Sequence, residues 1–387
     1  MKSIFIITNY YPPEIGAAAN RIYQLAEGLK KLNYSVSIVA PLPNYPRGKI
    51  FKNYKNKFKT VTDENGITVY RLWLLPSNSK NKIRRFLAML SYSFSLIWFF
   101  VFFKIPRIVI IQSPPLLVAF TSVCFLRSKQ RKLILNVSDL WPLAGLKLGV
   151  LKKNIVLKFL ERIEHFNYKN ASSILGQSNE ILEHVSSDFP NKKVFLYRNY
   201  PNLSKDTSFI PTVASEKIKL VYAGLLGIAQ GVFQLCKELD YTNLEFHIYG
   251  SGPEQYLIEH YIECNKHLPI VFHGELKREK LLDEIVTYNL AIIPLIDRIF
   301  GSVPSKIFEY ATLGLPILYF GGGEGEIIVE KYRLGWVSQP GDYKALNNLI
   351  KSLKKNEIDI KQKAIKETAY QHFNFNSQIK RLGDFID

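Results

Sequence analysis

The residues with the most evident chemical potential occupy the run Ser302-Val303-Pro304-Ser305-Lys306-Ile307-Phe308-Glu309. Either serine can cap the helix predicted to follow, and a helix N-terminus offers unpaired N–H groups and a positive dipole end. Lys306 adds a full positive charge, and Glu309 follows at i,i+3 spacing on the same helix face. This pattern suits a phosphate at the helix start and hydroxyl groups at Glu309. It also fits an ordinary capped helix with an ion pair.

Several glycine-containing loops follow apolar runs that predict strands. Small residues allow the backbone to approach a ligand closely, and a helix N-terminus favours an anion. The loops contain Gly16 and Ala17, ahead of Arg21; Gly224 and Gly227; Gly250 and Gly252; and the glycine-rich run 321–326, which ends at Glu326. The last suggests backbone contact with a ligand or a mobile lid. Each loop also fits a tight turn or a flexible loop, and the first lacks the G-x-G-x-x-G dinucleotide fingerprint.

Asp139 lies in Ser138-Asp139-Leu140-Trp141-Pro142, directly after an apolar run. A carboxylate at the end of a strand can hydrogen-bond the hydroxyl groups of a sugar or of an acceptor. The alternative is a structural aspartate that caps a helix or forms a turn.

The elements that must position these residues are strands alternating with helices. Short apolar runs predict strands at 2–8, 36–40, 68–75, 108–112, 133–136, 173–176, 218–223, 244–249, 270–273, 291–294 and 317–320, and 20–32 has helical spacing. We therefore predict two doubly wound α/β domains with parallel sheets, at 1–200 and 201–373, joined by a polar linker at 199–217. An amphipathic helix within 374–387 can return to the first domain. Ligands of such sheets bind beyond the carboxyl ends of the strands, which places the site in a cleft between the two sheets.

Length and composition agree with this organisation and exclude other classes. A chain of 387 residues predicts two domains, and 47% hydrophobic with 22% charged residues excludes disorder, collagen and a disulfide scaffold. The three cysteines show no zinc-binding spacing, and they fit a reducing compartment. The N-terminus turns polar too early for a signal peptide.

The positive charge is concentrated in the first half of the chain. Residues 1–200 hold 30 of the 51 Lys and Arg residues but only 10 of the 33 Asp and Glu residues. This asymmetry favours an anionic partner, and no nucleic-acid-binding motif is present. The uncharged, apolar run 86–103 is flanked by basic residues on both sides. It fits a monotopic helix on anionic lipid, a membrane span or a core helix.

The motifs together resemble family 4 of the retaining glycosyltransferases, which have the GT-B fold, and in particular the bacterial surface-polysaccharide branch that includes N-acetyl-fucosamine transferases. The resemblance rests on PPEIGAAANR (12–21), PNYPRG (43–48), SDLWP (138–142), AGLLGIAQG (223–231), YGSGPE (249–254) and VPSKIFEYATLGLPI (303–317). It implies a nucleotide diphosphate sugar on the second domain and an acceptor on the first, with front-face attack and retention at the anomeric carbon.

The resemblance also assigns roles to residues. It implies donor binding by Gly224, Gly227, Gly250, Gly252, Ser302, Pro304, Ser305, Lys306, Glu309 and Glu326, with Glu309 on the ribose, and acceptor binding by Gly16, Ala17 and Arg21. The other glutamate of the family's E-x₇-E motif is replaced by Gly301, and the usual Arg and Lys fall at about Leu225 and Gln230. We therefore expect Lys306 to neutralise the diphosphate and Asp139 to orient the acceptor or the donor sugar. These two are the expected catalytic residues.

No D-x-D motif occurs, so neither a metal nor another cofactor is expected. The resemblance to this branch implies UDP as the nucleotide. The predicted acceptor is a polyprenyl-diphosphate-linked saccharide for capsule, O-antigen or exopolysaccharide synthesis. The basic first domain and residues 80–107 would dock on the cytoplasmic face of the inner membrane. Two other readings stay open: a non-catalytic nucleotide-sugar-binding partner of another transferase, and a nucleotide-sugar epimerase of the same fold.

Overall fold

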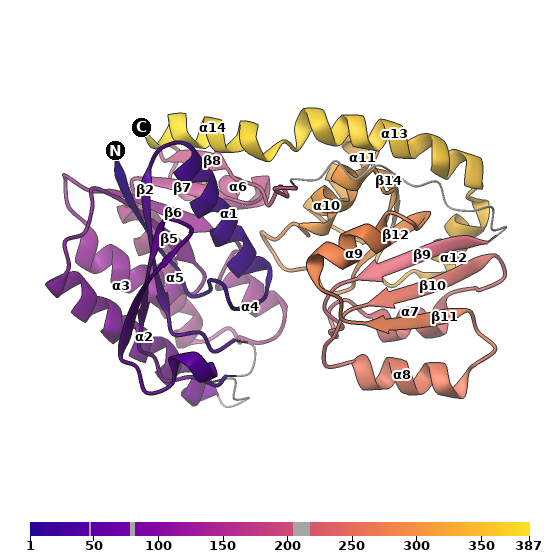
Figure 1. The fold of residues 1–387 in the computed structure, drawn as a ribbon, viewed down its shortest axis with the longest axis horizontal. Helices are drawn as coiled ribbons and strands as arrows, with labels where there is room; N and C mark the ends of the chain where they lie inside the picture. The colour runs from indigo at the N-terminus through magenta and orange to yellow at the C-terminus, as the bar shows by residue number, and fades with distance from the viewer. Residues whose placement is uncertain (46–47, 78–81, 204–216) are drawn as a thin grey trace. The chain divides into compact units, whose positions relative to one another are not determined.

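The computed structural model describes residues 1–45, 48–77, 82–203 and 217–387, and Figure 1 shows its ribbon. Most of the predicted linker, together with Lys80, Pro46 and Arg47, lies outside the described residues. The chain divides into two compact units. Unit 1 comprises Met1–Asn199, Ile299–Ser302 and Asn376–Asp387; unit 2 comprises Tyr200–Arg298 and Val303–Phe375.

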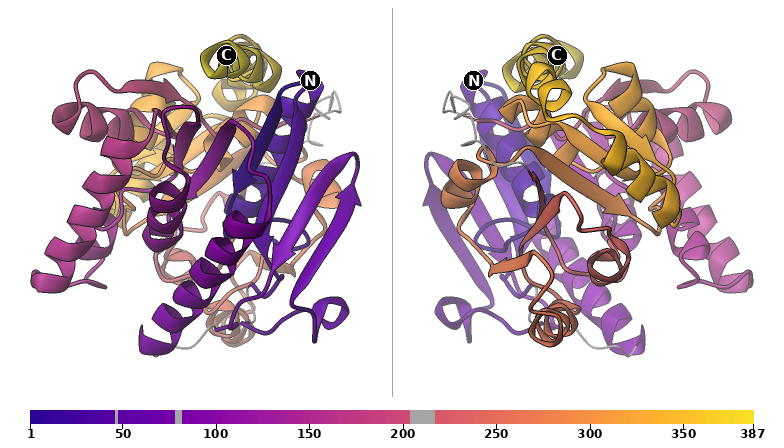
Figure 2. Two further views of the ribbon diagram at one scale, coloured as in Figure 1. Left: turned by 90° about the vertical axis from the view of Figure 1, so that its left-hand side faces the viewer. Right: turned by 90° about the vertical axis from the view of Figure 1, so that its right-hand side faces the viewer.

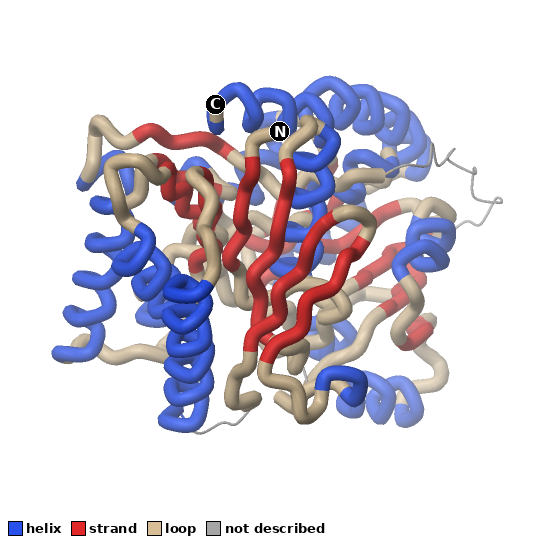
Figure 3. The backbone as a smooth tube through the Cα atoms, turned by 60° about the vertical axis from the view of Figure 1, so that its left-hand side comes forward, coloured by secondary structure: helices blue, strands red, loops and turns tan. Residues whose placement is uncertain are grey.

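Unit 1 contains an eight-stranded sheet with the order β3-β4-β2-β1-β5-β6-β7-β8. All neighbouring pairs are parallel except the hairpin of β3 and β4. Figure 3 shows the strands side by side. Their bounds are β1 Ser3–Ile7, β2 Ser35–Pro41, β3 Lys59–Glu64, β4 Ile67–Leu72, β5 Ile108–Ser113, β6 Lys132–Val137, β7 Ser173–Gly176 and β8 Lys193–Leu196.

The helices of unit 1 connect these strands. They are α1 Ala17–Lys31, the 3-10 helix Lys52–Tyr54, α2 Lys82–Phe102, α3 Leu116–Leu126, α4 Leu143–Lys147, α5 Ile155–Asn170, α6 Asn179–Asp188 and the C-terminal α14 Phe375–Ile386. Helix α3 packs between α2 and α5 (Figure 2). Their apolar side chains form one core with the sheet, because side chains such as Tyr92, Phe99 and Val118 are fully buried against strand residues.

Helix α14 docks on unit 1 through an apolar stripe. Ile379, Leu382 and Ile386 recur at helical spacing and are all buried. A Cβ on Gly28 of α1 would lie 2.6 Å from Ile379, so this glycine permits the close approach of the two helices. The side chain of Gln378 hydrogen-bonds both the N–H and the C=O of Arg198, at 3.0 and 2.9 Å.

Unit 2 contains a six-stranded, all-parallel sheet with the order β11-β10-β9-β12-β13-β14. This is the doubly wound order, in which the chain direction across the sheet reverses between β9 and β12. The strands are β9 Ile218–Ala223, β10 Leu244–Tyr249, β11 Ile270–Gly274, β12 Leu290–Leu295, β13 Ile317–Gly321 and β14 Gly335–Ser338. The helices are α7 Val232–Glu238, α8 Gln255–Cys264, α9 Arg278–Ile285, α10 Lys306–Leu313, α11 Glu324–Lys331, α12 Tyr343–Ser352 and α13 Lys355–His372.

The structure confirms the predicted strands to within two or three residues, and α1 and α14 lie where helices were predicted. Three strands are absent from the prediction: β3, β8 and β14. β8 and β14 have four residues each, and β3 (Lys-Thr-Val-Thr-Asp-Glu) carries almost no apolar pattern. The predicted loop at 321–326 is wrong for its second half, because Glu324 begins α11.

Candidate functional site

In both sheets the strand order reverses between two central strands, and loops beyond the carboxyl ends of those strands are where such folds bind ligands. In unit 1 the reversal lies between β1 and β5, and in unit 2 between β9 and β12. Most of the predicted site residues of unit 2 lie on α10 or on the loops after β9, β10 and β12. The exception is Glu326, which follows β13. The predicted residues of unit 1 follow β1 and β6. Each unit therefore has its own candidate site, described separately below.

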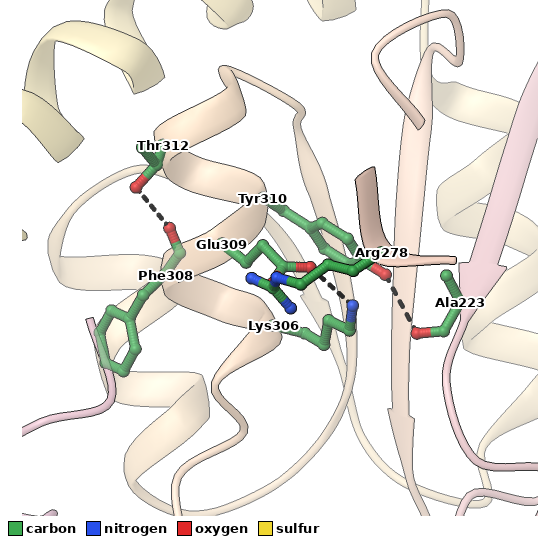
Figure 4. Close-up of polar contacts among 7 residues, drawn as sticks. All are labelled: Ala223, Arg278, Lys306, Phe308, Glu309, Tyr310 and Thr312. Atoms are coloured by element: carbon green, nitrogen blue, oxygen red, sulfur yellow. Dashed lines mark hydrogen bonds and ion pairs between the residues drawn. The ribbon is translucent and has the colours of Figure 1, made fainter. Parts of the chain in front are cut away.

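The centre of the unit 2 site is the carboxylate of Glu309 on α10. Its Oε1 accepts a hydrogen bond from Lys306 Nζ at 2.6 Å, and its Oε2 accepts one from Arg278 Nη2 at 2.5 Å (Figure 4). The Glu309 side chain is 8% exposed, whereas those of Lys306 and Arg278 are 27% and 48% exposed. One buried carboxylate is thus held between two cations that are still accessible to solvent.

Opposing effects act on the pKa of Glu309. Burial is the largest single effect and raises the pKa, but Lys306 and Arg278, by charge and hydrogen bonding, together lower it below its ordinary value. Glu309 is therefore ionised at neutral pH and acts only as a hydrogen-bond acceptor. Such a group suits recognition of a pair of hydroxyls.

Tyr310 connects this cluster to the end of β9. Its hydroxyl donates to the carbonyl oxygen of Ala223 at 3.4 Å, and Lys306 Nζ lies 5.5 Å from its ring centroid. The predicted side-chain cap is not formed. Ser305 is the N-cap residue of α10 but accepts no hydrogen bond from the first turn, and Ser302 belongs to unit 1. Pro304 accepts instead through its backbone, from the N–H of Ile307 at 3.1 Å.

The glycines of the next two loops have a packing role. A Cβ on Gly250, whose φ is +138°, would lie 1.8 Å from the carbonyl oxygen of Gly224, and one on Gly252 would lie 2.5 Å from that of Leu226. Backbone hydrogen bonds join the loops, for example from Gly224 N–H to the Tyr249 carbonyl at 3.0 Å. The backbones of the loops after β9 and β10 are therefore in direct contact and hydrogen-bonded to each other, next to α10. Gly227 lies in the same loop, beside the side chain of Gln230.

Glu326 lies on a separate part of unit 2. It is in the first turn of α11, and its Oε1 accepts from Gln339 Nε2 at 2.8 Å. Its contacts do not join it to Glu309 and Lys306. Of the predicted donor residues, the structure therefore brings together those of α10 with the loops after β9 and β10.

The unit 1 site is a connected network of buried polar side chains. Arg21 of α1 donates to Oδ1 of Asn199 and, at 2.8 Å, to Oδ1 of Asn136. Asn136 donates to Gln112 at 2.7 Å, and Asn199 donates to Gln177 at 2.9 Å. The Arg21 guanidinium also lies 4.7 Å from the ring centroid of Tyr197, and burial lowers its pKa to about 10.

Asp139 lies at the edge of this network. Burial raises the pKa of its carboxyl, while a hydrogen bond with Ser302 and the charge of Arg21 partly oppose that rise. The segment 299–302 is fixed on unit 1, since Gly301 N–H donates to Glu180 Oε2 at 2.7 Å and Leu140 N–H donates to the Phe300 carbonyl at 3.0 Å. Ser302, predicted with the donor residues, therefore lies beside Asp139.

Gly16 and Ala17 begin α1, and Glu14 organises the loop before them. The buried Glu14 Oε1 accepts from the N–H groups of Asn44 and Tyr45, both at 2.8 Å. Burial raises the pKa of Glu14, and these hydrogen bonds partly counter the effect. The loop that contains Glu14 is thus held to the backbone of Asn44 and Tyr45 by one carboxylate.

Sequence reasoning missed several functional candidates. Arg278 stands in the charge-rich run Lys277-Arg278-Glu279-Lys280, and nothing in that run distinguishes it from a solvated surface. The amides Gln112, Asn136, Gln177 and Asn199 come from separate segments. Their shared signal is a polar side chain at or just beyond the end of a buried strand. Within the described ranges, no cluster of three or more His, Cys, Asp or Glu side chains has a geometry that can hold a metal ion.

Comparison with known proteins indicates which class of protein has this geometry. Residues 16–199 match the model of the "Glycosyl transferase 4-like domain", and residues 204–372 match that of "Glycosyl transferases group 1". No curated protein matches the chain. With the two doubly wound units, these matches support a glycosyltransferase of the GT-B fold.

Solved structures share the fold at low sequence identity. Sucrose-phosphate synthase from Thermosynechococcus elongatus is 14% identical, with a TM-score of 0.75, over 99% of this chain and 98% of that chain. HepE of Anabaena, in complex with UDP and glucose, is 12% identical, with a TM-score of 0.67, over 99% of both chains. A variant of S. aureus TarM, in complex with fondaparinux, α-GlcNAc-glycerol and UDP, is 10% identical, with a TM-score of 0.69, over 100% of both.

Proposed function

We propose that this protein is a retaining glycosyltransferase that moves a sugar, an N-acetyl-aminosugar by the branch resemblance, from a UDP-sugar to a polyprenyl-diphosphate-linked saccharide. The observation that carries the proposal is the Lys306–Glu309–Arg278 cluster of unit 2. It lies at the start of α10, which contacts the end of β9, where the strand order reverses. The UDP bound to HepE and to the TarM variant agrees with a nucleotide donor.

The cluster contains the groups that such a reaction requires. Departure of a nucleoside diphosphate develops negative charge, which preorganised cations stabilise. Lys306 has N–H donors beyond the one directed at Glu309, and Arg278 is half exposed. We assign both to the diphosphate. Glu309 Oε1 and Oε2 have further lone pairs, and we assign them to the ribose hydroxyls. Arg278 thereby supplies the second cation for which the sequence offered no candidate at Leu225 or Gln230.

Unit 1 would supply the acceptor side of the reaction. The raised pKa of Asp139 fits a carboxyl that can exchange a hydrogen bond with an acceptor hydroxyl or with the donor sugar. With no covalent nucleophile assigned, the leaving phosphate would act as the base for front-face attack. Arg21 is too deeply buried to hold a substrate directly, so we assign it to positioning Asn136 and Asn199.

The first experiment is thermal stabilisation of the full chain by UDP, GDP and CMP, each with and without EDTA. A ligand at 100 times its dissociation constant adds about 2.7 kcal/mol of stability. A shift with UDP that EDTA does not change supports the proposal, and product formation from UDP-sugars then identifies the donor. A shift with GDP alone keeps the reaction but replaces the nucleotide. The absence of any shift contradicts the proposed donor site.

We propose, further, that unit 1 binds the anionic cytoplasmic face of the membrane through α2. One stripe of this helix is buried in the core, including Tyr92, Leu96 and Phe99. The other stripe exposes Phe94, Val101 and Phe102, each about two-thirds exposed, ahead of Lys104. Among the described residues, no helix has the length and apolar character needed to cross a membrane. An amphipathic helix beside basic residues is typical of binding in the interface.

Vesicle co-sedimentation tests this second part. We expect binding to vesicles that contain phosphatidylglycerol, and weak binding to neutral phosphatidylcholine vesicles. Phe94→Ser with Val101→Ser should reduce binding, while Tyr370→Ser, which changes an exposed aromatic residue on α13 of unit 2, should not. Equal binding by both variants would contradict the role of α2.

A further inference from the structure

A cavity of about 940 Å³ opens in unit 1 at the amino ends of its central strands. Its wall includes Ser3, Ile108 and Lys132, which are the first residues of β1, β5 and β6. Asp139 and the other site residues follow the opposite ends of these strands, about 17–20 Å away for strands of this length. The cavity is therefore separate from the candidate site of unit 1.

The wall of this cavity is strongly basic. Six of its residues are cationic, namely Lys2, Lys104, Arg107, Lys129, Arg131 and Lys132, and Asp387 has its only acidic side chain. Asp387 is already paired, since Lys2 Nζ lies 2.9 Å from its Oδ1 and Tyr34 donates to the same oxygen. Five further cations thus share one cavity without an acidic partner in its wall. Such crowding costs free energy unless an anion occupies the space.

Part of the wall is fixed and part is available. Arg131 donates to the carbonyl oxygens of Leu126 and Pro106, at 2.7 and 3.3 Å, and Lys132 Nζ donates to that of Ile386 at 2.6 Å. These bonds to neutral carbonyl groups hold the two cations in place without neutralising their charge. The side chains of Lys104, Arg107 and Lys129 are exposed, and none makes a hydrogen bond or ion pair with another described residue.

From this geometry we propose that the cavity is a binding site for a multiply charged phosphate group. Arg107 and Lys129 contact its oxygens directly, and Arg131 and Lys132 contribute the fixed positive field. The volume is that of a small-molecule site, large enough for a diphosphate with an attached group. The phosphate belongs either to a soluble phosphorylated compound or to the headgroup of an anionic lipid. The proposal does not depend on the proposed donor site.

The electrostatics of Lys132 agree with this assignment. Burial lowers its pKa, and the nearby charges of Lys193, Lys2 and Arg107 lower it further, against the opposing effect of Asp387. A bound anion would reverse the effect of the cations.

Calorimetric titration of the full chain with inorganic pyrophosphate at low salt tests the site. The pocket variant is Arg107→Gln with Lys129→Gln, and the matched control is Lys55→Gln with Lys57→Gln, which removes two exposed charges elsewhere on unit 1. Lys306→Met removes a cation of the proposed donor site. We expect the pocket variant to weaken binding roughly tenfold or more. The control and Lys306→Met should keep the binding event that the pocket variant loses.

Vesicles distinguish the two sources of phosphate. If the natural ligand is a lipid headgroup, the pocket variant should lose binding to phosphatidylglycerol vesicles beyond the loss seen in the control. If it is soluble, only pyrophosphate binding should respond. Equal losses in the pocket variant and the control, for both probes, would show a general charge effect and overturn the proposal. Pyrophosphate binding that only Lys306→Met removes, with vesicle binding unaffected in the pocket variant, would overturn it as well.

Discussion

The charged side chains beyond the carboxyl ends of the two sheets differ in how exposed they are to solvent. In unit 2, Glu309 and Lys306 come from one helical turn, and the two cations around the carboxylate are partly exposed. In unit 1, Arg21 is buried, and its partners Asn136 and Asn199 lie 115 and 178 residues further along the chain. The first arrangement can reorganise around a ligand, because its cations are solvated. The second is locked by packing and serves as a fixed support.

The same difference appears in the pKa directions. The carboxyl groups of unit 1, Asp139 and Glu14, have raised pKa values because burial dominates. Glu309 is also buried, but its pKa is lowered because two cations contact it. Burial alone therefore does not decide the charge state of these carboxyl groups. The presence of a directly bonded cation does, and of these three carboxyl groups Glu309 has such a cation.

The largest expected effect is on catalysis, in unit 2. Lys306→Ala should lower kcat/KM by about 10²–10³-fold, as expected when a preorganised charge at the leaving group is removed. It should change the free energy of unfolding by less than about 1 kcal/mol, because Arg278 still pairs with Glu309. Transfer assays and urea denaturation measure the two effects, with Lys344→Ala on α12 as the control. Unchanged activity would remove Lys306 from the mechanism.

The next effect is on stability, in unit 1. Arg21→Met should lower the free energy of unfolding by about 2–3 kcal/mol, because the buried oxygen of Asn136 and the half-buried oxygen of Asn199 lose their donors. Lys31→Met, at an exposed position of the same helix, should be nearly neutral. If the two variants are equally stable in urea denaturation, the network is not the support described above.

A smaller change is expected at the loops joined by Glu14. Glu14→Ala removes the acceptor for two N–H groups, and we expect a loss of about 1–2 kcal/mol. Limited proteolysis should detect faster cleavage near Asn44 in the variant than in the parent. Glu27→Ala on α1 is the control, and equally fast cleavage in that variant would argue against a specific role of Glu14.

The smallest effects concern pH, and they have opposite signs in the two units. The folded pKa of Glu309 is lowered, so the stability it contributes is present above its unfolded pKa and is lost as pH falls through the folded value. The folded pKa of Asp139 is raised, so stability is lost as pH rises through that range. The loss of unfolding free energy caused by Glu309→Gln should therefore become smaller as the pH falls. The increase in unfolding free energy caused by Asp139→Asn should be present at neutral pH and disappear at acidic pH. Urea denaturation over a series of pH values measures both, and the same trend in the two variants would contradict this prediction.

The parts of the molecule that sequence could predict are those encoded locally. Buried parallel strands give continuous apolar runs, so most strands and the two-domain organisation were predictable. The pairing of Lys306 with Glu309 follows from i,i+3 spacing. Arg278 was not predictable, because its partner lies 31 residues away, on another helix. The amide network of unit 1 could not be predicted either, because its side chains come from separate segments and hydrogen-bond one another only when the strands lie side by side.

The return of α14 to unit 1 has a consequence for the order in which the molecule can be built. Ribosomal synthesis delivers residues 1–199 first, but the surface that Ile379 and Leu382 cover on unit 1 is filled only by residues made after all of unit 2. During synthesis this apolar surface of the first unit therefore stays exposed until α14 has been made, and exposed apolar surface favours aggregation or chaperone binding. A nascent chain halted before residue 375 should therefore carry a first unit that is less protected from proteolysis than the same unit in the finished protein.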